Sequence, residues 1–180
     1  MLALALNFVE FNMPNLKNNR GFTLIELLLY TVIAAGLLLA ITAMIALLSK
    51  SRIKNQTIGT VEQQGEQIMQ IINQEIRNSK MVVVPTNGNS GTTLQLQDIF
   101  GQPIIFDLAS TTLRATKSNQ TTAISSNRIT VSELQFLNLS PDNLHNSIKI
   151  KFTLSYNNIA GRIEYNYSQT FYGTATLRQP

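Results

Sequence analysis

The sequence predicts an α+β protein in which one long N-terminal helix packs against a small antiparallel β-rich domain. Three observations predict this fold class. Residues 22–48 form an almost uninterrupted apolar run. Residues 49–80 are polar but carry apolar residues at three- and four-residue spacing, which is typical of an amphipathic helix. Beyond Met81, apolar and polar residues alternate over short runs separated by glycine and proline, which is typical of strands and turns.

Length and composition narrow the classes of function. The 180 residues suffice for one folded domain and one additional element, since domains usually comprise about 100–200 residues. The chain has no cysteine, which excludes disulfides, thiol chemistry and cysteine-ligated metal sites. Basic residues that flank the apolar run account for the net charge of +4, and we interpret them as membrane-flanking charges and not as a nucleic-acid patch. They are Lys17, Arg20, Lys50, Arg52 and Lys54.

Residues 1–21 are predicted to be a leader, and an alternative start at Met13 would make this leader short and basic. Residues 22–48 are predicted to be the transmembrane half of the helix, because a hydrocarbon core requires about 20 apolar residues at roughly 1.5 Å each. The apolar region of an ordinary cleavable signal is only about 7–15 residues long, so we expect this segment to stay in the mature protein. Basic residues lie on both sides of it, which leaves its orientation open.

Residues 49–80 are predicted to continue the same helix as its amphipathic upper half. No proline interrupts residues 15–84, and proline is the residue that most strongly ends a helix. The apolar positions form one stripe along this half, and we expect the following domain to cover it. The stripe comprises Ile53, Thr57, Val61, Gly65, Ile68, Ile72 and Ile76.

Residues 81–180 are predicted to form a β-rich globular head. Short strands with one buried face are expected at three places in its first half. Their apolar residues are Leu94 and Leu96, then Ile104, Phe106 and Leu108, then Leu113 and Ala115. In residues 128–139 apolar and polar residues alternate, but the alternation shifts by one residue between Val131 and Leu134. This shift predicts a β-bulge near Ser132 or Glu133.

The clearest strand is residues 147–156, SIKIKFTLSY, which alternates apolar and polar residues throughout. A second alternating run, residues 163–167, follows the turn at residues 157–161, so the two runs are predicted to form an antiparallel hairpin. We interpret the aromatic residues of this region as core and cross-strand packing. They are Tyr156, Tyr165, Tyr167, Phe171 and Tyr172.

Glu26 places a carboxylate inside the apolar run. An ionised carboxylate within a membrane costs about 3 kcal/mol unless it is paired, and such residues are functional by default. No lysine or arginine lies within residues 22–48 to pair with it. If the chain were cut after Gly21, however, Phe22 would carry a new amine at a similar depth, and the carboxylate of one subunit would meet the amine of its neighbour. The alternative is a tolerated polar residue that reaches the membrane edge.

Residues 21–26, GFTLIE, together with Lys17 and Arg20, resemble the class III signal of type IV pilins and of the pseudopilins of type II secretion systems. The resemblance implies the pilin fold, cleavage between Gly21 and Phe22 by a prepilin peptidase, N-methylation of Phe22 and an assembly role for Glu26. It also implies a single-pass protein of the cell membrane, with the leader in the cytoplasm and the C-terminal domain outside, which then enters a pilus or pseudopilus.

A weaker similarity continues through residues 61–80, which resemble the upper helix of J-type minor pseudopilins and W-type minor pilins. The chain departs from major pilins in its long apolar leader, in a membrane helix without proline and in the absence of a C-terminal disulfide loop. The last two departures favour a minor subunit or a pseudopilin over a major pilin. The expected partners are other pilin or pseudopilin subunits, the prepilin peptidase, the inner-membrane assembly machinery and membrane lipid.

The rival hypothesis is a single-pass anchored domain that binds an extracytoplasmic ligand and does not polymerise. A simple anchor has no need of Glu26 after a processed Phe22, which discriminates the two hypotheses. A third hypothesis, a membrane-anchored hydrolase, requires a nucleophile arrangement, and none surrounds the single histidine, His145. We therefore expect no enzymatic activity.

We expect no cofactor, no metal ion and no specific binding of nucleic acid. Calcium loops place their acidic ligands at short fixed intervals, with a glycine at the turn. Asp98, Asp107 and Asp142 are scattered and do not follow that spacing, so a calcium site would require that they converge in space.

Overall fold

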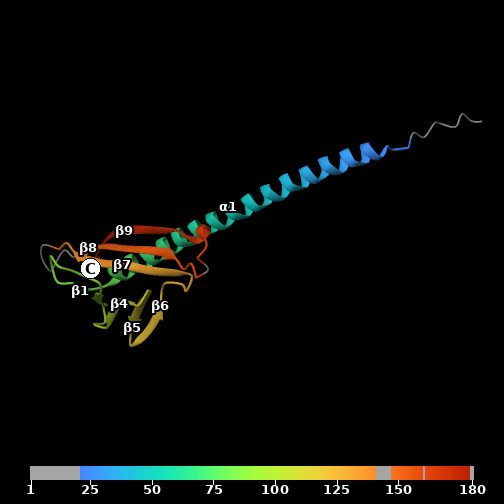
Figure 1. Ribbon diagram of the computed structural model, residues 1–180. Coiled ribbons are helices and arrows are strands. Elements are labelled where there is room, and N and C mark those ends of the chain that lie inside the picture. The colour runs from blue at the N-terminus through green and yellow to red at the C-terminus, as the bar shows by residue number, and fades with distance from the viewer. Residues whose placement is uncertain (1–20, 141–146, 160, 179–180) are drawn as a thin grey trace, which may run out of the picture. The chain divides into compact units, whose positions relative to one another are not determined.

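The computed structural model describes residues 21–140, 147–159 and 161–178 (Figure 1). These residues form an α+β fold, one long helix followed by two antiparallel sheets, as the sequence predicts. The chain divides into two compact units, Met1–Ile45 and Ala46–Pro180. Several residues considered above lie outside the described residues. They are Met13, Lys17, Arg20, Asp142 and His145.

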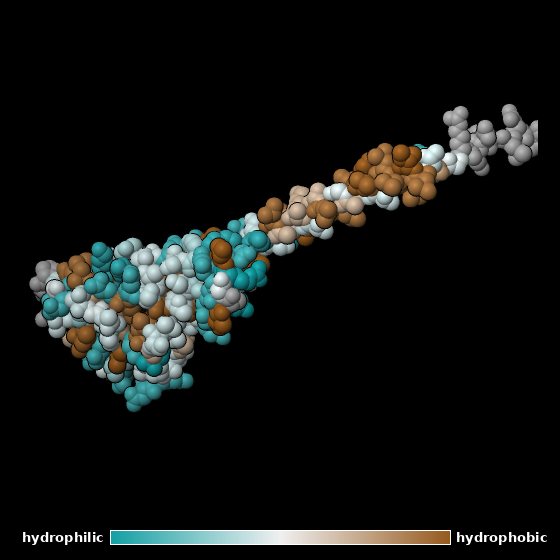
Figure 2. Space-filling model, viewed as in Figure 1, coloured by the Kyte–Doolittle hydropathy of each residue, from teal (hydrophilic) through white to brown (hydrophobic). Residues whose placement is uncertain are grey.

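Helix α1 comprises Leu24–Asn78. Its first half exposes its apolar side chains, and Figure 2 shows hydrophobic residues covering this part of the helix surface. An 18-residue stretch of α1 has a mean hydropathy of 2.5, so the helix is long and apolar enough to span a membrane.

The second half of α1 buries the predicted stripe. Six of its seven members are buried, and Ile53, the first, is half-buried. Thr57 is the polar member, and its hydroxyl donates a hydrogen bond to the carbonyl of Ile53 at 3.0 Å, so burial leaves no donor unpaired. The helix ends at Asn78. The hydroxyl of the next residue, Ser79, donates a hydrogen bond to the carbonyl of Glu75 at 2.6 Å.

The first sheet has five strands in the order β1-β3-β4-β5-β6. The strands are β1 (Met81–Val84), β3 (Leu94–Gln97), β4 (Pro103–Ala109), β5 (Thr112–Lys117) and β6 (Gln120–Ala123). The three strands predicted from alternation, β3, β4 and β5, are confirmed. Leu94 pairs with Phe106 and Leu96 with Ile104, and all four side chains are buried on the inner face.

The second sheet has four strands in the order β2-β7-β8-β9. They are β2 (Ser90–Gly91), β7 (Ile129–Asn138), β8 (Ser147–Tyr156) and β9 (Ser168–Thr176). The alternating strand β8 is confirmed, with its apolar residues buried from Ile148 to Leu154. The predicted bulge is also confirmed, because the β7–β8 register shifts between Ser132 and Gln135 and Glu133 has a positive φ of 52°.

The predicted partner of β8 was wrong. Ile163–Tyr165 form a short 3-10 helix, η1, and β8 pairs instead with β9, which begins at Ser168. Local hydrogen bonds explain the difference: the side chain of Asn158 donates to the carbonyl of Arg162 at 2.8 Å and accepts from its N–H at 3.0 Å. Such side-chain bonds compete with a strand ladder.

One hydrophobic core joins the stripe of α1 to the inner faces of both sheets. Strand β9 packs closely on the helix, because a Cβ on Gly65 would collide with the ring of Phe171. Phe171 stacks on Phe152 of β8 with ring centroids 5.4 Å apart, and Tyr156 stacks on Tyr165 at the same separation, as predicted for the aromatic residues. Tyr172 departs from that prediction and is 65% exposed.

Candidate functional site

The residues predicted to carry the function lie at the start of α1. Thr23 directly precedes the first helical residue, and its hydroxyl oxygen accepts a hydrogen bond from the N–H of Glu26 at 3.3 Å. Threonine is favoured here because it satisfies one of the N–H groups that have no partner within the helix. Thr23 and Glu26 also have the Thr-x-x-Glu spacing of a capping box, and the helix dipole favours negative charge in the first turn.

The carboxylate of Glu26 is only partly satisfied within the described chain. Glu26 is half-buried, whereas its neighbours on the first turns are exposed. The hydroxyl of Tyr30 donates to Glu26 Oε1 at 3.4 Å, which is long for a bond between two oxygens. A carboxylate has about four acceptor positions, so one long bond leaves most of its capacity unused. None of the ion pairs among the described residues involves Glu26.

Gly21 and Phe22 lie outside the helix and are exposed. Phe22 is 74% exposed, and its ring meets that of Tyr30 edge to face at 6.1 Å. A Cβ on Gly21 would meet no atom within 4 Å, so packing in this chain does not require glycine there. Both residues of the Gly21–Phe22 bond are thus exposed within the described part of the chain.

The structure therefore brings Phe22, Glu26 and Tyr30 together at one helix end. Sequence reasoning missed two contributors, Thr23 as the helix cap and Tyr30 as the hydrogen-bond partner. A sequence pattern could have predicted each of them. The first is the capping-box spacing, and the second is the four-residue interval that places Glu26 and Tyr30 on one helix face.

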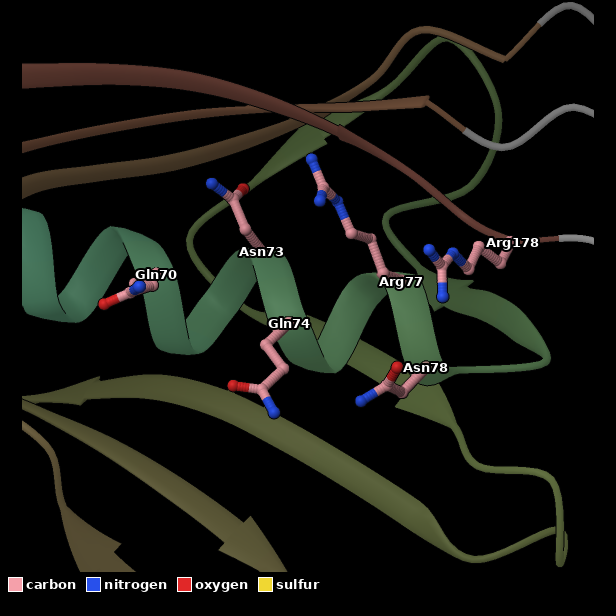
Figure 3. A pocket seen from close by; sticks show the side chains of 6 residues that line it. All are labelled: Gln70, Asn73, Gln74, Arg77, Asn78 and Arg178. Atoms are coloured by element: carbon pink, nitrogen blue, oxygen red, sulfur yellow. The ribbon is translucent and has the colours of Figure 1, made fainter.

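A separate polar pocket of about 280 Å³ lies at the C-terminal end of α1 (Figure 3). Figure 3 shows Asn73 and Arg77 extending to one side of the helix and Gln74 to the other. Asn73 Oδ1 is buried without a hydrogen-bond partner among the described residues. The lining offers amide groups and two guanidinium groups. It consists of Gln70, Asn73, Gln74, Arg77, Asn78 and Arg178.

The described aspartates have structural partners. Both oxygens of Asp107 bind Arg114, at 2.6 and 3.2 Å. Asp98 accepts hydrogen bonds from the N–H groups of Phe100 and Gln102, each at 2.8 Å. Within the described part of the chain, no three His, Cys, Asp or Glu residues gather as metal ligands would.

No protein-family model matches this chain, and the comparisons with curated proteins and with solved structures also give no match. Its function must therefore be inferred from the start of α1 and from the apolar surface that follows.

Proposed function

We propose that this chain is a structural subunit, and a minor one, of a type IV pilus or of a type II secretion pseudopilus. The carrying observation is Glu26, a carboxylate with unused acceptor capacity, one turn after the exposed residues Gly21 and Phe22 at the start of an apolar helix. The pilin-like resemblance of residues 21–26 supports the same conclusion.

The exposed apolar half of α1 requires a cover. Each large apolar side chain left in water forgoes about 1.5–3 kcal/mol, so the helix must lie in lipid or among other helices. In lipid the hydrophobic effect does not drive helices together, and association depends on packing and on polar contacts. A specific polar contact near the start of α1 would therefore select the partner helix and its register.

Glu26 supplies one half of such a contact. Cleavage after Gly21 gives Phe22 an α-amine, which is cationic when protonated and can then pair with a carboxylate. We propose that the amine of one subunit pairs with the Glu26 carboxylate of its neighbour. The pair would offset the cost of about 3 kcal/mol for an unpaired carboxylate in the membrane.

The proposal fixes the remaining roles. Residues 1–21 are the leader, 22–48 the transmembrane half of the helix, 49–80 its upper half and 81–180 the head of a pilin fold. A prepilin peptidase cleaves the leader in the cytoplasm and Phe22 is N-methylated. The inner-membrane assembly machinery then brings this subunit together with other pilin or pseudopilin subunits. No catalysis, cofactor or metal is part of this role.

The second candidate is a single-pass anchored binding domain that does not polymerise. The pocket with Arg77 and Arg178 favours it, because two guanidinium groups and several amides suit a polar ligand. This candidate gives no reason for a carboxylate at Glu26 beyond helix capping.

Three variants separate an assembly contact from helix capping. Glu26→Gln keeps the size and hydrogen-bonding capacity of the side chain but removes its charge, Glu26→Ala removes both, and Thr23→Ala removes the cap alone. We expect all three to insert in the membrane of the native host. Filaments should incorporate the Thr23 variant but neither Glu26 variant, as measured by immunoblotting of sheared filaments.

Mass spectrometry of the mature N-terminus provides the control. The proposal expects a chain that begins at methylated Phe22 in the wild type and in every variant compared. An intact leader in cells with active peptidase would contradict the proposal. So would normal recruitment of Glu26→Gln, or equal losses in Glu26→Gln and Thr23→Ala.

A further inference from the structure

The described residues of the connection between β8 and β9, 157–159 and 161–167, include two exposed isoleucines. Ile159 is 90% exposed and Ile163 is 82% exposed, although they lie in the compact unit that also contains the core. Single exposed apolar residues are common on protein surfaces. Here two of them lie on one short connection.

The connection is attached to α1 just after the apolar run. Lys54 Nζ donates a hydrogen bond to the carbonyl of Asn166 at 2.6 Å and lies 5.6 Å from the ring centroid of Tyr167. Lys54 follows Leu48, the last residue of the run, by less than two turns, or roughly 9 Å along a helix. The headgroup layer on each side of a bilayer is about 5–8 Å thick. At roughly 9 Å the attachment itself lies just beyond this layer when residues 22–48 span the membrane. Glu164, next to Ile163, interacts with Lys50, which is only two residues after Leu48, so this part of the connection lies closer to the headgroups.

Basic residues outnumber acidic residues in this region, where Glu62 of α1 interacts with Tyr167. Glu164 is the one acidic residue in the sequence of the connection, and it is paired with Arg162 at 3.5 Å. A hydrogen bond from its own backbone, with the charges of Arg162 and Lys50, lowers the pKa of Glu164. Other basic residues contact the connection at its two ends: Lys54 binds the carbonyl of Asn166, and the carbonyl of Arg128, just before β7, accepts from the N–H of Asn157.

Tyrosines complete the surface. Tyr165 stacks on Tyr156 and also lies 5.5 Å from the guanidinium of Arg162, while Tyr167 lies under Lys54. Tyrosine is enriched where membranes meet water, because its ring is apolar and its hydroxyl is polar. Lysine and arginine at the same depth keep their stems in lipid and their charges among the headgroups.

We propose that the β8–β9 connection is a second membrane contact of this protein. Ile159 and Ile163 insert at the boundary between headgroups and acyl chains, and the surrounding basic residues bind the headgroups of anionic phospholipids. The contact holds the head against the outward-facing surface of the membrane that residues 22–48 span, before the subunit is assembled. It rests on the membrane-spanning part of the proposed function and is independent of filament formation.

Site-directed spin labelling of the full chain tests the contact. The chain has no cysteine, so a single introduced cysteine takes the label. The test site is Ile163→Cys, and the matched control is Ile99→Cys, an exposed isoleucine on the β3–β4 turn. That turn lies next to Lys80, whose N–H binds the carbonyl of Gln97 at 2.8 Å, and is thus far from Lys54 along α1. Leu38→Cys reports insertion of the apolar run.

The vesicles contain equal parts of phosphatidylcholine and phosphatidylglycerol. The readout is the ratio of collisions with oxygen, which concentrates in lipid, to collisions with a water-soluble nickel chelate. We expect a ratio at position 163 at least several-fold higher than at 99, together with a high ratio at 38. We also expect the ratio at 163 to fall in vesicles of phosphatidylcholine alone, because the anionic headgroups are then missing.

The outcomes that overturn the inference are distinct. Equal ratios at 163 and 99, with a high ratio at 38, would show that the connection does not touch lipid although the helix spans the membrane. A low ratio at 38 would overturn both the span and the contact. An unchanged ratio at 163 without phosphatidylglycerol would overturn the role of anionic headgroups.

Discussion

The ring of Phe171 on β9 occupies the space that a side chain at Gly65 of α1 would need. Glycine at this position therefore lets the strand approach the helix. Gly173 has the same role on the strand, because a Cβ there would collide with the sulfur of Met69. Helix and strand thus carry complementary gaps, and each gap is filled from the opposite element.

Substitution of Gly65 should destabilise the head. Overpacking of a core costs about 1–3 kcal/mol, whereas alanine gains about 1 kcal/mol of helix propensity over glycine. We expect Gly65→Ala to lower the free energy of unfolding by up to about 2 kcal/mol, measured by urea denaturation of the full chain in detergent. Gly59→Ala is the control, because a Cβ at this exposed helix position meets nothing within 4 Å, and it should be neutral or stabilising. Equal effects at both positions would contradict this packing.

The contribution of Glu133 to the stability of the head should be lost in acid. Hydrogen bonds from Lys151 and Thr153, with the charge of Lys151, lower the pKa of Glu133 from its ordinary value of 4.5. A carboxyl group with a lowered pKa in the folded state contributes stability above its unfolded pKa and loses it as pH falls through the folded pKa. This contribution is therefore present above about pH 4.5 and disappears below it.

Glu133→Gln should reduce this loss of stability below pH 4.5, as measured by thermal unfolding across a pH series. Lys151→Gln removes the main partner, with its ion pair of 3.2 Å, and should reduce the same slope. A Glu133→Gln variant with the full acid-dependent loss of the wild type would show that the bulge carboxylate does not contribute.

Asn158 should hold the β8–β9 connection in place. Its amide group donates to the carbonyl of Arg162 and to the side chain of Asn166, and its oxygen accepts from the N–H of Arg162 at 3.0 Å. Net contributions of about 0.5–1.5 kcal/mol per bond, reduced by exposure, predict a loss of about 1–2 kcal/mol in Asn158→Ala. Hydrogen exchange of the Arg162 amide should accelerate. Asn158→Asp keeps the acceptor and should protect that amide better than alanine does; equal exchange in both variants would refute the assignment.

Asp98 should stabilise the β3–β4 turn in the same way. One carboxylate oxygen accepts from the N–H groups of Phe100 and Gln102, and Gly101 supplies the positive φ of 80° that the turn requires. We expect Asp98→Ala to cost about 1–2 kcal/mol and to accelerate exchange of both amides, since such side-chain bonds replace part of a backbone turn. Asp98→Asn retains an acceptor oxygen and should lose less. Similar losses in the two variants would argue against this role of the oxygen.

The elements that were predicted correctly are those in which one residue pattern has one physical cause. The stripe from Thr57 to Ile76 repeats with the period of a helix, and β8 alternates with the period of a strand. The bulge near Glu133 was predictable because an extra residue in a strand reverses the faces of all later side chains, and the apolar pattern of β7 carries that reversal.

The elements that were missed depend on contacts between distant residues. Strand β9 is rich in threonine and contains Gly173, so its own pattern is weak, and its place follows from packing on Met69 and Phe152. Residues 163–167 alternate like a strand, yet the side chain of Asn158 folds them locally. At the candidate site, Gly21, Phe22 and Glu26 were recognised from their order in the chain, whereas the orientation of Tyr30 toward Glu26 depends on side-chain conformation, which the sequence does not specify.

The cover of Gly65 is encoded about a hundred positions further along the chain, and loop closure over such separations is slow. During synthesis, Gly65 of α1 therefore emerges long before β9 exists to cover it. The strands made before β9 supply the other core partners of the stripe, but the gap at Gly65 is closed only when Phe171 arrives. Translation that stalls before Ser168 would leave this one gap in the helix surface open.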